Sequence, residues 1–548
     1  MIRDSKIWIA DDEKGENIFM LPNMSNRHGL VAGATGTGKT VTLKVMAEAF
    51  SDMGVPVFMA DVKGDVAGLA APGDDSESMQ KRIEKFGLAE AGFSYHGYPV
   101  TIWDIFGSTG VPLRTTVSEM GPLLLSRVLN LNDLQTDIMN VIFKIADDNN
   151  LLLVDTKDLK ALLNYVGEHS SELAAEYGKI QTSSIGAMTR AIVALEMEGG
   201  EVFFGETALN VADWLTPAAD GRGMIHILDS SGLINNGRLY ATFLLWLISE
   251  LFENLPEVGD LEKPRLVFFF DEAHLLFDDA PKVLVDKIEQ MVKLIRSKGV
   301  GIYFCTQNPK DVPDGVLAQL NNKVQHGLRA YTPSEQKSVK AAAESFRANP
   351  EFDTYDAILA LGTGEAIVSF LGSDGVPDIA RKAFILPPQS RMNTISDMER
   401  NACISGSHLY GKYFQSHDPE SAYEFLMRMG MTQEAAAVQE APPEPTLPGM
   451  GNAQPQPQSQ PVPAQQQQAV PASQPQESQM SKEEQKAQEK REKEKRKAMN
   501  SVGTTVSGTI GRELGKQFGK TMGSFGKTFG GNVGASIGRG LFSTLFKK

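Results

Sequence analysis

One short segment limits the folds open to this chain more than any other: residues 33–40 have the sequence Gly-Ala-Thr-Gly-Thr-Gly-Lys-Thr. Every fixed position of the phosphate-binding loop pattern G-x-x-x-x-G-K-[ST] is filled. The apolar residues 30–32 before it indicate the end of a buried strand, and residues 41–50 after it indicate a helix. The motif requires this context, so the sequence predicts an α/β domain that binds a nucleoside triphosphate.

The residue types in this loop explain the predicted chemistry. Its glycines let backbone N–H groups and the N-terminus of the following helix face an anion. Lys39 would neutralise the terminal phosphates, and the Thr40 hydroxyl is placed to bind the Mg²⁺ that bridges the β- and γ-phosphates, so the expected ligands are ATP and Mg²⁺. The predicted nucleotide-binding residues are Gly33, Ala34, Thr35, Gly36, Thr37, Gly38, Lys39, Thr40 and Val41.

The length and composition of the chain are typical of a globular protein with two or three domains. The sequence has 548 residues, 41% of them apolar, and no stretch approaches the roughly 20 apolar residues that cross a bilayer. Its N-terminus lacks the apolar core of a signal peptide, so we expect a cytoplasmic protein. Cys305 and Cys403 have no metal-ligand spacing, which predicts reduced structural thiols rather than a zinc site.

The net charge of −15 is unevenly distributed. Residues 481–548 carry 15 Lys or Arg and 6 Glu, whereas the first 436 residues carry a net charge of −21. This is not the composition of a globally basic nucleic-acid-binding protein, although a ring with an acidic exterior and a basic channel would be consistent with it.

Two apolar segments predict buried strands that end in acidic residues. Residues 57–60 are followed by Asp61 and Asp65, which would lie near the nucleotide or would only cap a turn or helix. Residues 266–270 predict a central parallel strand, and the acidic pair that follows it resembles a Walker B motif. The predicted roles are support of the Mg²⁺ shell for Asp271 and orientation of the attacking water for Glu272, although Asp271 would serve equally as a helix cap.

Gln307 and two arginines complete the candidate catalytic set. Another apolar strand is predicted at residues 300–305, and Gln307 after it would sense the γ-phosphate or the attacking water, or would only bind backbone. Arg296 and Arg329 are alternative candidates for a finger that stabilises transition-state charge across a subunit interface. Otherwise Arg296 would complement a helix C-terminus, and Arg329 would be an exposed strand residue.

The order of these motifs carries a family resemblance. They are the loop at 33–40, the Asp61–Asp65 strand end, Phe-Phe-Phe-Asp-Glu-Ala-His at 268–274 and Arg-Ser-Lys-Gly-Val-Gly-Ile-Tyr-Phe-Cys-Thr-Gln-Asn-Pro at 296–309. Together they resemble the HerA/FtsK superfamily of RecA-like motors, and over nearly its whole length the chain looks like the bacterial YjgR-type HerA-like proteins.

The resemblance implies a homo-hexameric ATPase with nucleotide at the subunit interfaces and DNA as the usual track. It also implies Lys39 and Thr40 as nucleotide ligands, Glu272 as the catalytic carboxylate and Gln307 as the sensor. HerA itself has an N-terminal β-barrel and works with a nuclease. Only 32 residues precede Gly33 here, too few for that barrel, so we do not expect docking to a HerA-type nuclease.

The predicted fold is a RecA-like P-loop NTPase core with a mostly parallel sheet, a helical insertion, a disordered linker and a glycine-rich helical tail. Residues 1–115 and 201–436 would form the core, and 116–200 the insertion, because long amphipathic segments replace strand signals there. Those segments are residues 120–129, 134–147, 156–166 and 185–197.

The last 112 residues have a different composition. Residues 437–480 are rich in Pro, Gln and Ala, which predicts a disordered linker, and residues 481–548 form a basic tail. From Ile510 to Leu545 an apolar residue recurs at every fourth position with a single three-residue step, often followed by Gly. Each Gly costs an isolated helix roughly 1 kcal/mol relative to Ala, so this helix would form only against a partner. That partner would be a second copy, the motor domain, another protein or an anionic membrane surface.

Two functions fit these observations. The leading one is a ring-shaped, ATP-driven DNA translocase or helicase. The alternative is a DNA-independent NTPase that acts as a switch or assembly factor on a protein or membrane partner, since no aromatic and basic track for nucleic acid is visible. Stimulation of hydrolysis by DNA would separate the two.

Overall fold

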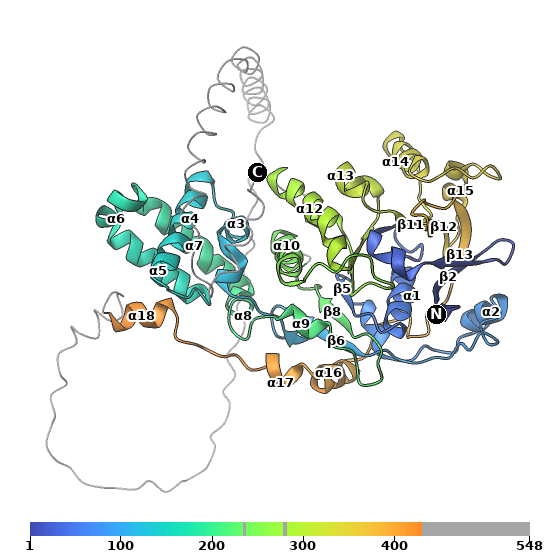
Figure 1. Cartoon of the computed structure of the whole chain (residues 1–548), viewed down its shortest axis with the longest axis horizontal. Coiled ribbons are helices and arrows are strands. Elements are labelled where there is room, and N and C mark those ends of the chain that lie inside the picture. The colour runs from blue at the N-terminus through green and yellow to red at the C-terminus, as the bar shows by residue number, and fades with distance from the viewer. Residues whose placement is uncertain (234–236, 278–281, 430–548) are drawn as a thin grey trace, which may run out of the picture. The chain divides into compact units, whose positions relative to one another are not determined.

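A sheet of 13 strands organises the part of the chain described by the computed structural model, which comprises residues 1–233, 237–277 and 282–429 (Figure 1). The predicted linker and tail lie outside the described residues. The strands are β1 Ile2–Arg3, β2 Lys6–Asp12, β3 Asn17–Met20, β4 Gly29–Ala32, β5 Val57–Asp61, β6 Val100–Asp104, β7 Val111–Pro112, β8 Ile225–Asp229, β9 Leu266–Phe270, β10 Val300–Thr306, β11 Asn322–His326, β12 Glu365–Ser369 and β13 Arg381–Ile385.

Most of this sheet is parallel, as predicted. Its order is β1-β2-β13-β12-β11-β4-β10-β9-β5-β8-β6-β7, with β3 paired to β2. The strands from β11 to β7 in this order are parallel to their neighbours, whereas β12, β13, β2 and β1 continue the sheet in antiparallel pairs. The sequence patterns did not predict this antiparallel extension.

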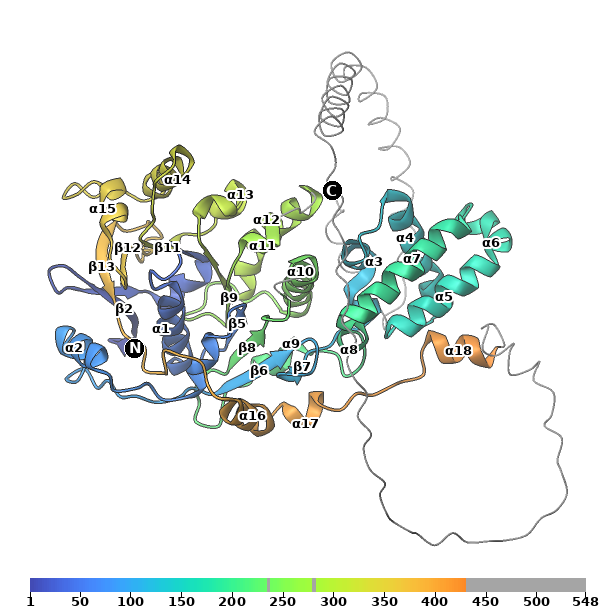
Figure 2. The same ribbon diagram turned by 180° about the vertical axis from the view of Figure 1, so that it is seen from behind.

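Some helices flank the sheet and a separate group of helices lies to one side of it, as Figures 1 and 2 show from opposite directions. The helices are α1 Lys39–Asp52, α2 Glu77–Lys85, α3 Val117–Val128, α4 Asp133–Asp148, α5 Thr156–Glu168, α6 Ser170–Tyr177, α7 Thr182–Leu195, α8 Glu201–Phe203, α9 Val211–Trp214, α10 Gly237–Asn254, α11 His274–Phe277, α12 Lys282–Ile295, α13 Asp314–Leu317, α14 Pro333–Glu344, α15 Thr354–Ala360, α16 Asp397–Gly406, α17 Tyr410–Tyr413 and α18 Ala422–Arg428.

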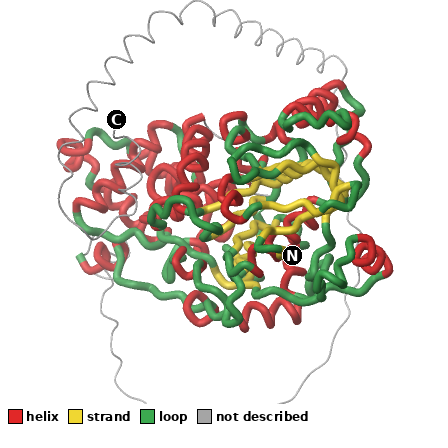
Figure 3. The backbone as a smooth tube through the Cα atoms, turned by 45° about the vertical axis from the view of Figure 1, so that its right-hand side comes forward, coloured by secondary structure: helices red, strands yellow, loops and turns green. Residues whose placement is uncertain are grey.

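The parallel strands send alternate side chains to two covered faces. In β9, Phe268 and Phe270 lie in one apolar cluster with α10 and α12, whereas Val267 and Phe269 lie in a second cluster with α1. All five residues of β9 are buried, and the strands run between helices in Figure 3. A strand covered on both faces explains why this segment is continuously apolar.

Each of the four predicted amphipathic segments overlaps a helix, namely α3, α4, α5 and α7, and within residues 116–200 the structure adds the α-helix α6, which was not predicted. Capping boxes at Thr116, Asn132 and Asp155 begin the first three helices. The later helix α18 packs on α5, where Ser421 donates a hydrogen bond of 2.5 Å to Asp158. All described residues belong to one compact unit, so the division into 1–115, 116–200 and 201–436 stays a prediction.

The parallel strands bring their carboxyl ends to the same edge of the sheet, which we call the carboxyl edge. The P-loop after β4 lies there with the loops that follow β5, β9, β10 and β11. Ligands of open α/β sheets bind at this edge. Among the described residues, no helix is both long and apolar enough to span a membrane.

Candidate active site

The P-loop forms the predicted turn between β4 and α1. Gly38 has a φ of 116° and caps the N-terminus of α1, a left-handed conformation that side chains rarely adopt. A Cβ on Gly33 would lie 2.5 Å from the Cβ of His326, so only glycine fits there. A Cβ on Gly36 would meet nothing within 4 Å. The loop is therefore packed on its inner side and open above Gly36.

Backbone hydrogen bonds fasten the P-loop to the two neighbouring strands. Gly33 donates to the carbonyl of Thr306 at 3.2 Å, and Ala34 donates to the carbonyl of Gly327 at 3.0 Å. Within the loop, the Thr37 hydroxyl donates to the Ala34 carbonyl at 2.7 Å. The ends of β10 and β11 therefore determine where the loop lies.

Lys39 lies inside the loop that it follows. Its Nζ donates to the carbonyls of Gly33 at 2.6 Å and Ala34 at 3.1 Å. Burial lowers the pKa of Lys39, and the nearby carboxylates of Glu272 and Asp271 oppose this effect. The loop thus encloses a cation where the motif predicts phosphate binding. Thr40 and Val41, both half-buried, complete the first turn of α1.

Glu272 follows β9 and faces the same loop. Its carboxylate accepts an ion pair from Lys63 Nζ at 2.8 Å and hydrogen bonds from Gln307 Nε2 at 3.3 and 3.4 Å. Burial would raise the pKa of Glu272, but these two partners outweigh it and hold the pKa below its ordinary value. Its backbone has a φ of 48°, a strained conformation for a non-glycine residue that is typical of functional sites.

Gln307 joins the P-loop to this carboxylate. The hydroxyl of Thr35 donates to Gln307 Oε1 at 3.4 Å, while the amide nitrogen of Gln307 faces Glu272. The residue predicted as a sensor therefore lies between the loop and the carboxylate predicted to act in hydrolysis.

Asp271 is buried next to Glu272. The Cys305 thiol hydrogen-bonds to its carboxylate, and Tyr240 donates to its carbonyl at 3.0 Å. Burial raises the pKa of Asp271, which Lys63 partly opposes. No cluster of three or more His, Cys, Asp or Glu among the described residues is placed to hold a metal ion by itself. Thr40 and Asp271 carry the hydroxyl and carboxylate oxygens that Mg²⁺ takes together with substrate phosphates, so they stay the predicted ligands of this ion.

Asp61 shapes the loop from which Lys63 extends. Its carboxylate accepts hydrogen bonds from the N–H groups of Lys63, Gly64 and Val66 at 3.2, 2.8 and 3.0 Å. Burial and the neighbouring Asp65 raise the pKa of Asp61 to about 6. Asp61 thus caps a turn, one of the two roles considered from sequence. Sequence analysis did not identify Lys63, because its partner Glu272 lies more than 200 residues later in the chain.

The two candidate finger arginines lie at opposite ends of the parallel strands. Arg329 follows the carboxyl end of β11, and Arg296 precedes the start of β10. Arg329 is exposed and follows Gly327, whose carbonyl binds the P-loop. Arg296 pairs with Asp260 at 3.4 Å. A strand of the length of β10 spans roughly 20 Å, so Arg296 does not reach the P-loop of its own chain. A role across an interface stays a prediction for both.

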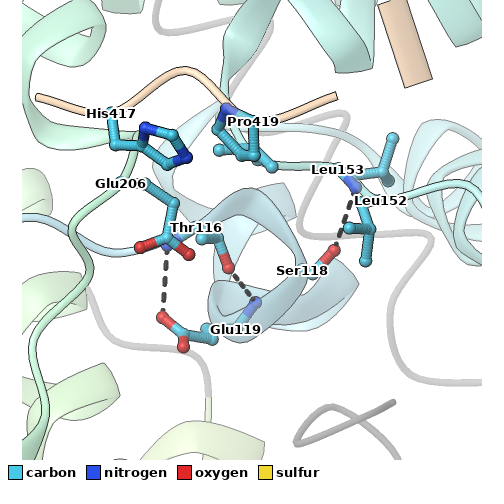
Figure 4. A pocket seen from close by; sticks show the side chains of 9 residues that line it. Thr116, Ser118, Glu119, Leu152, Leu153, Glu206, His417 and Pro419 are labelled. Atoms are coloured by element: carbon cyan, nitrogen blue, oxygen red, sulfur yellow. Dashed lines mark hydrogen bonds between the residues drawn. The ribbon is translucent and has the colours of Figure 1, made fainter. Parts of the chain in front are cut away.

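A pocket of about 290 Å³ lies elsewhere, beside the helical insertion (Figure 4). Its carboxylates are Glu119 and Glu206. Glu119 accepts from the backbone of Thr116, whose hydroxyl caps α3, and Glu206 accepts from the backbone of Ala208. Both groups are therefore engaged in local structure, and none of the sequence-predicted site residues lines this pocket.

Comparison with known proteins places the chain in a helicase-like family. A family model described as Helicase HerA-like C-terminal matches residues 6–528. A probable helicase of Methanocaldococcus jannaschii is 34% identical over 146 residues, which cover 26% of either chain. The DNA double-strand break repair helicase HerA of Sulfurisphaera tokodaii is 22% identical over 359 residues. That match spans 63% of the length of both proteins.

The solved structures that resemble this chain have lower sequence identity to it than these relatives do. The bacterial conjugative coupling protein TrwB has a TM-score of 0.45 at 15% identity, covering 72% of this chain and 93% of that chain. VirB4 of Thermoanaerobacter pseudethanolicus has a TM-score of 0.46 at 13% identity, covering 73% of this chain and 99% of that chain.

Proposed function

The chain belongs to the helicase HerA-like C-terminal family, and from this premise we propose that it is an ATP-driven motor that hydrolyses ATP at the carboxyl edge. The observation that carries the proposal is the hydrogen-bonded path from Thr35 of the P-loop through Gln307 to Glu272. A phosphate held by the loop would therefore lie beside an ionised carboxylate, the arrangement needed for attack by water.

Each residue has a distinct role in this proposal. Lys39 would exchange its bonds to loop carbonyls for bonds to the β- and γ-phosphate oxygens, which carry more charge. Mg²⁺, when bound, neutralises charge on these phosphates, and Thr40 and Asp271 are the residues that would hold it. Gln307 would contact the γ-phosphate or the attacking water and change its contacts after hydrolysis.

Glu272 would orient the attacking water and polarise it. Its low pKa keeps the carboxylate ionised at neutral pH, as this role requires. Lys63 and Gln307 hold the carboxylate toward the loop. Since both occupy its oxygens, the water must share or displace one of these partners before it reaches Glu272.

We further propose that the track is DNA and that the protein works in the cytoplasm as a homo-hexameric ring. The name of the Sulfurisphaera tokodaii relative supports DNA as the track. Arg329 is the better placed finger, because it is exposed and lies at the carboxyl edge, whereas Arg296 lies at the amino-terminal ends of the parallel strands.

Steady-state ATP hydrolysis by the purified full-length protein tests this proposal, with and without single- and double-stranded DNA at two salt concentrations. We expect hydrolysis that DNA stimulates, and stimulation that falls as salt rises because phosphate contacts release counterions. Hydrolysis that is indifferent to DNA would contradict the DNA track and support the switch or assembly factor. No hydrolysis under any condition would contradict the proposed motor altogether.

A further inference from the structure

The order of the strands indicates on which side of the P-loop a bound nucleoside would lie. On one side of β4 lie β10 and β9, which carry Gln307 and Glu272, and on the other side lie β11 and β12. If the γ-phosphate faces Glu272 and the P-loop encloses the phosphates, the nucleoside must leave the loop on the side of β11 and β12. This step rests on the proposed function, because it takes its direction from Glu272.

A second glycine-containing turn lies against the P-loop on that side. It comprises residues 362–365, which follow α15 and end at the first residue of β12, and the N–H of Gly364 donates to the Thr37 carbonyl at 2.9 Å. A Cβ on Gly38 would lie 3.4 Å from the Cα of Gly364, so the gap between the two turns at this point is about the size of one methyl group. This turn is therefore the part of the protein that directly borders the P-loop on the side where the nucleoside would lie.

Arg82 of α2 reaches over the same turn. Its guanidinium donates to the carbonyl of Ile385 at 3.1 Å and to that of Thr363 at 3.4 Å. A Cβ on Gly364 would lie 2.4 Å from Nη2 of Arg82, so the guanidinium fills the space that a side chain there would take.

The charge of Arg82 has no close acidic partner. No Asp or Glu among the described residues lies within 4.0 Å of its guanidinium, and the nearby Glu365 instead accepts from the N–H of Gly362 at 2.9 Å. A guanidinium has five N–H donors, more than the two carbonyls use. A half-buried arginine with spare donors thus lies beside the P-loop, on the side that the nucleoside must occupy.

We infer that Arg82 and the turn at residues 362–365 form the nucleoside-binding wall of the site, where the guanidinium contacts the ribose and base of a bound nucleoside di- or triphosphate. Both kinds of contact suit arginine, because its donors match ribose oxygens and its plane stacks on an aromatic base. α2 is distant from the P-loop in sequence, so its contribution is visible only in the fold.

Calorimetric titration of the full-length protein with two ligands tests this inference, one being ADP with Mg²⁺ and the other inorganic tripolyphosphate, which has no nucleoside. We expect Arg82→Ala to weaken ADP binding about 10-fold and to leave tripolyphosphate binding within about 2-fold. Arg82→Lys keeps the charge and the aliphatic stem, so it should lose less affinity for ADP. Lys81→Ala is the matched control, because Lys81 lies on the same helix with its side chain 71% exposed and paired to Glu77.

Three outcomes would overturn the inference. The first is an Arg82→Ala protein that binds ADP as tightly as the wild type. The second is an equal loss for ADP and tripolyphosphate, which would assign Arg82 to the phosphates or to the stability of the loop. The third is a wild-type protein that binds neither ligand, and this outcome alone would also contradict the proposed nucleotide site.

Discussion

The carboxyl edge and the helical insertion both contain buried carboxylates, but their partners differ. At the edge, Glu272 is held by the side chains of Lys63 and Gln307, which come from other strand ends. In the insertion, Asp158 accepts from the backbone of Val154 and from Ser421, and it completes the cap of its own helix. Glu272 at the edge thus contacts a cationic and an amide side chain, whereas Asp158 in the insertion binds backbone and hydroxyl groups.

This difference distinguishes a chemical role from a structural one better than burial does. Glu272 has a lowered pKa despite burial, because a cation faces it. Glu250 of α10 is buried without a cation partner, and its pKa rises to about 8 through burial and then through Glu119 and Glu253. Orienting and polarising a water requires an ionised carboxylate, which Glu272 supplies, whereas Glu250 holds its proton at neutral pH.

The largest expected effect is the loss of nucleotide binding in Lys39→Ala. This substitution removes the cation enclosed by the P-loop, and we expect ATP affinity to fall by at least about 100-fold, or about 2.7 kcal/mol. Lys160→Ala is the control, since Lys160 pairs with Glu196 inside the insertion at 2.7 Å and should leave affinity unchanged. Titration with ATP and Mg²⁺ measures both. Equal affinity in the wild type and Lys39→Ala would contradict the role of the loop.

A smaller effect, on stability, is expected from Glu250→Gln. Because the pKa of Glu250 is about 8 in the folded protein and near 4.5 when unfolded, the folded state holds the proton more tightly. The stability that this provides is complete below pH 4.5 and is lost as the pH rises to about 8. Glutamine does not titrate, so Glu250→Gln should melt at higher temperature than the wild type at pH 9, by about 2 °C, with no difference near pH 4.5.

Thermal unfolding at several pH values measures this difference. Glu77→Gln is the control, because its side chain is 82% exposed and its substitution should not change the pH dependence. A melting difference for Glu250→Gln that is the same at pH 4.5 and pH 9 would show that Glu250 is not protonated in the folded state.

The smallest expected effect comes from Thr116→Ala at the start of α3. Its hydroxyl accepts from the N–H of Glu119 at 3.1 Å, and loss of such a cap costs about 1 kcal/mol. ATP turnover should not change, because we expect neither Thr116 nor its partner Glu119 to take part in hydrolysis. Thr116→Ser keeps the hydroxyl and should restore stability in denaturant titrations. A Thr116→Ala protein with normal stability but reduced turnover would contradict the assignment of a chemical role to the carboxyl edge and a structural role to the insertion.

The sequence predicts the parts of the site that depend on local order. The P-loop spacing and the apolar strands before Glu272 and Gln307 are short-range patterns, and the parallel sheet follows from them. The structure adds how these parts meet: the Glu272 contacts to Gln307 and the Thr35 contact that joins it to the loop.

What the sequence does not predict depends on long-range register. The Lys63 ion pair, the turn at Gly364 and the packing of His326 against Gly33 all join segments that are hundreds of residues apart. The antiparallel strands β12 and β13 were missed for the same reason, since pairing partners are not encoded in the pattern of one strand. Helix α6 was missed because it is a short helix with no buried residue, so it has little apolar periodicity.

The central claim is that hydrolysis occurs at the carboxyl edge through Glu272. It is tested most directly by comparing ATP turnover and ADP affinity in Glu272→Gln and Glu119→Gln, one carboxylate from each region. We predict that Glu272→Gln binds ADP normally but hydrolyses ATP at least about 100-fold more slowly, since a positioned base contributes about 10²–10⁴ to rate. Glu119→Gln should hydrolyse ATP at the wild-type rate. Normal turnover in Glu272→Gln would contradict the account.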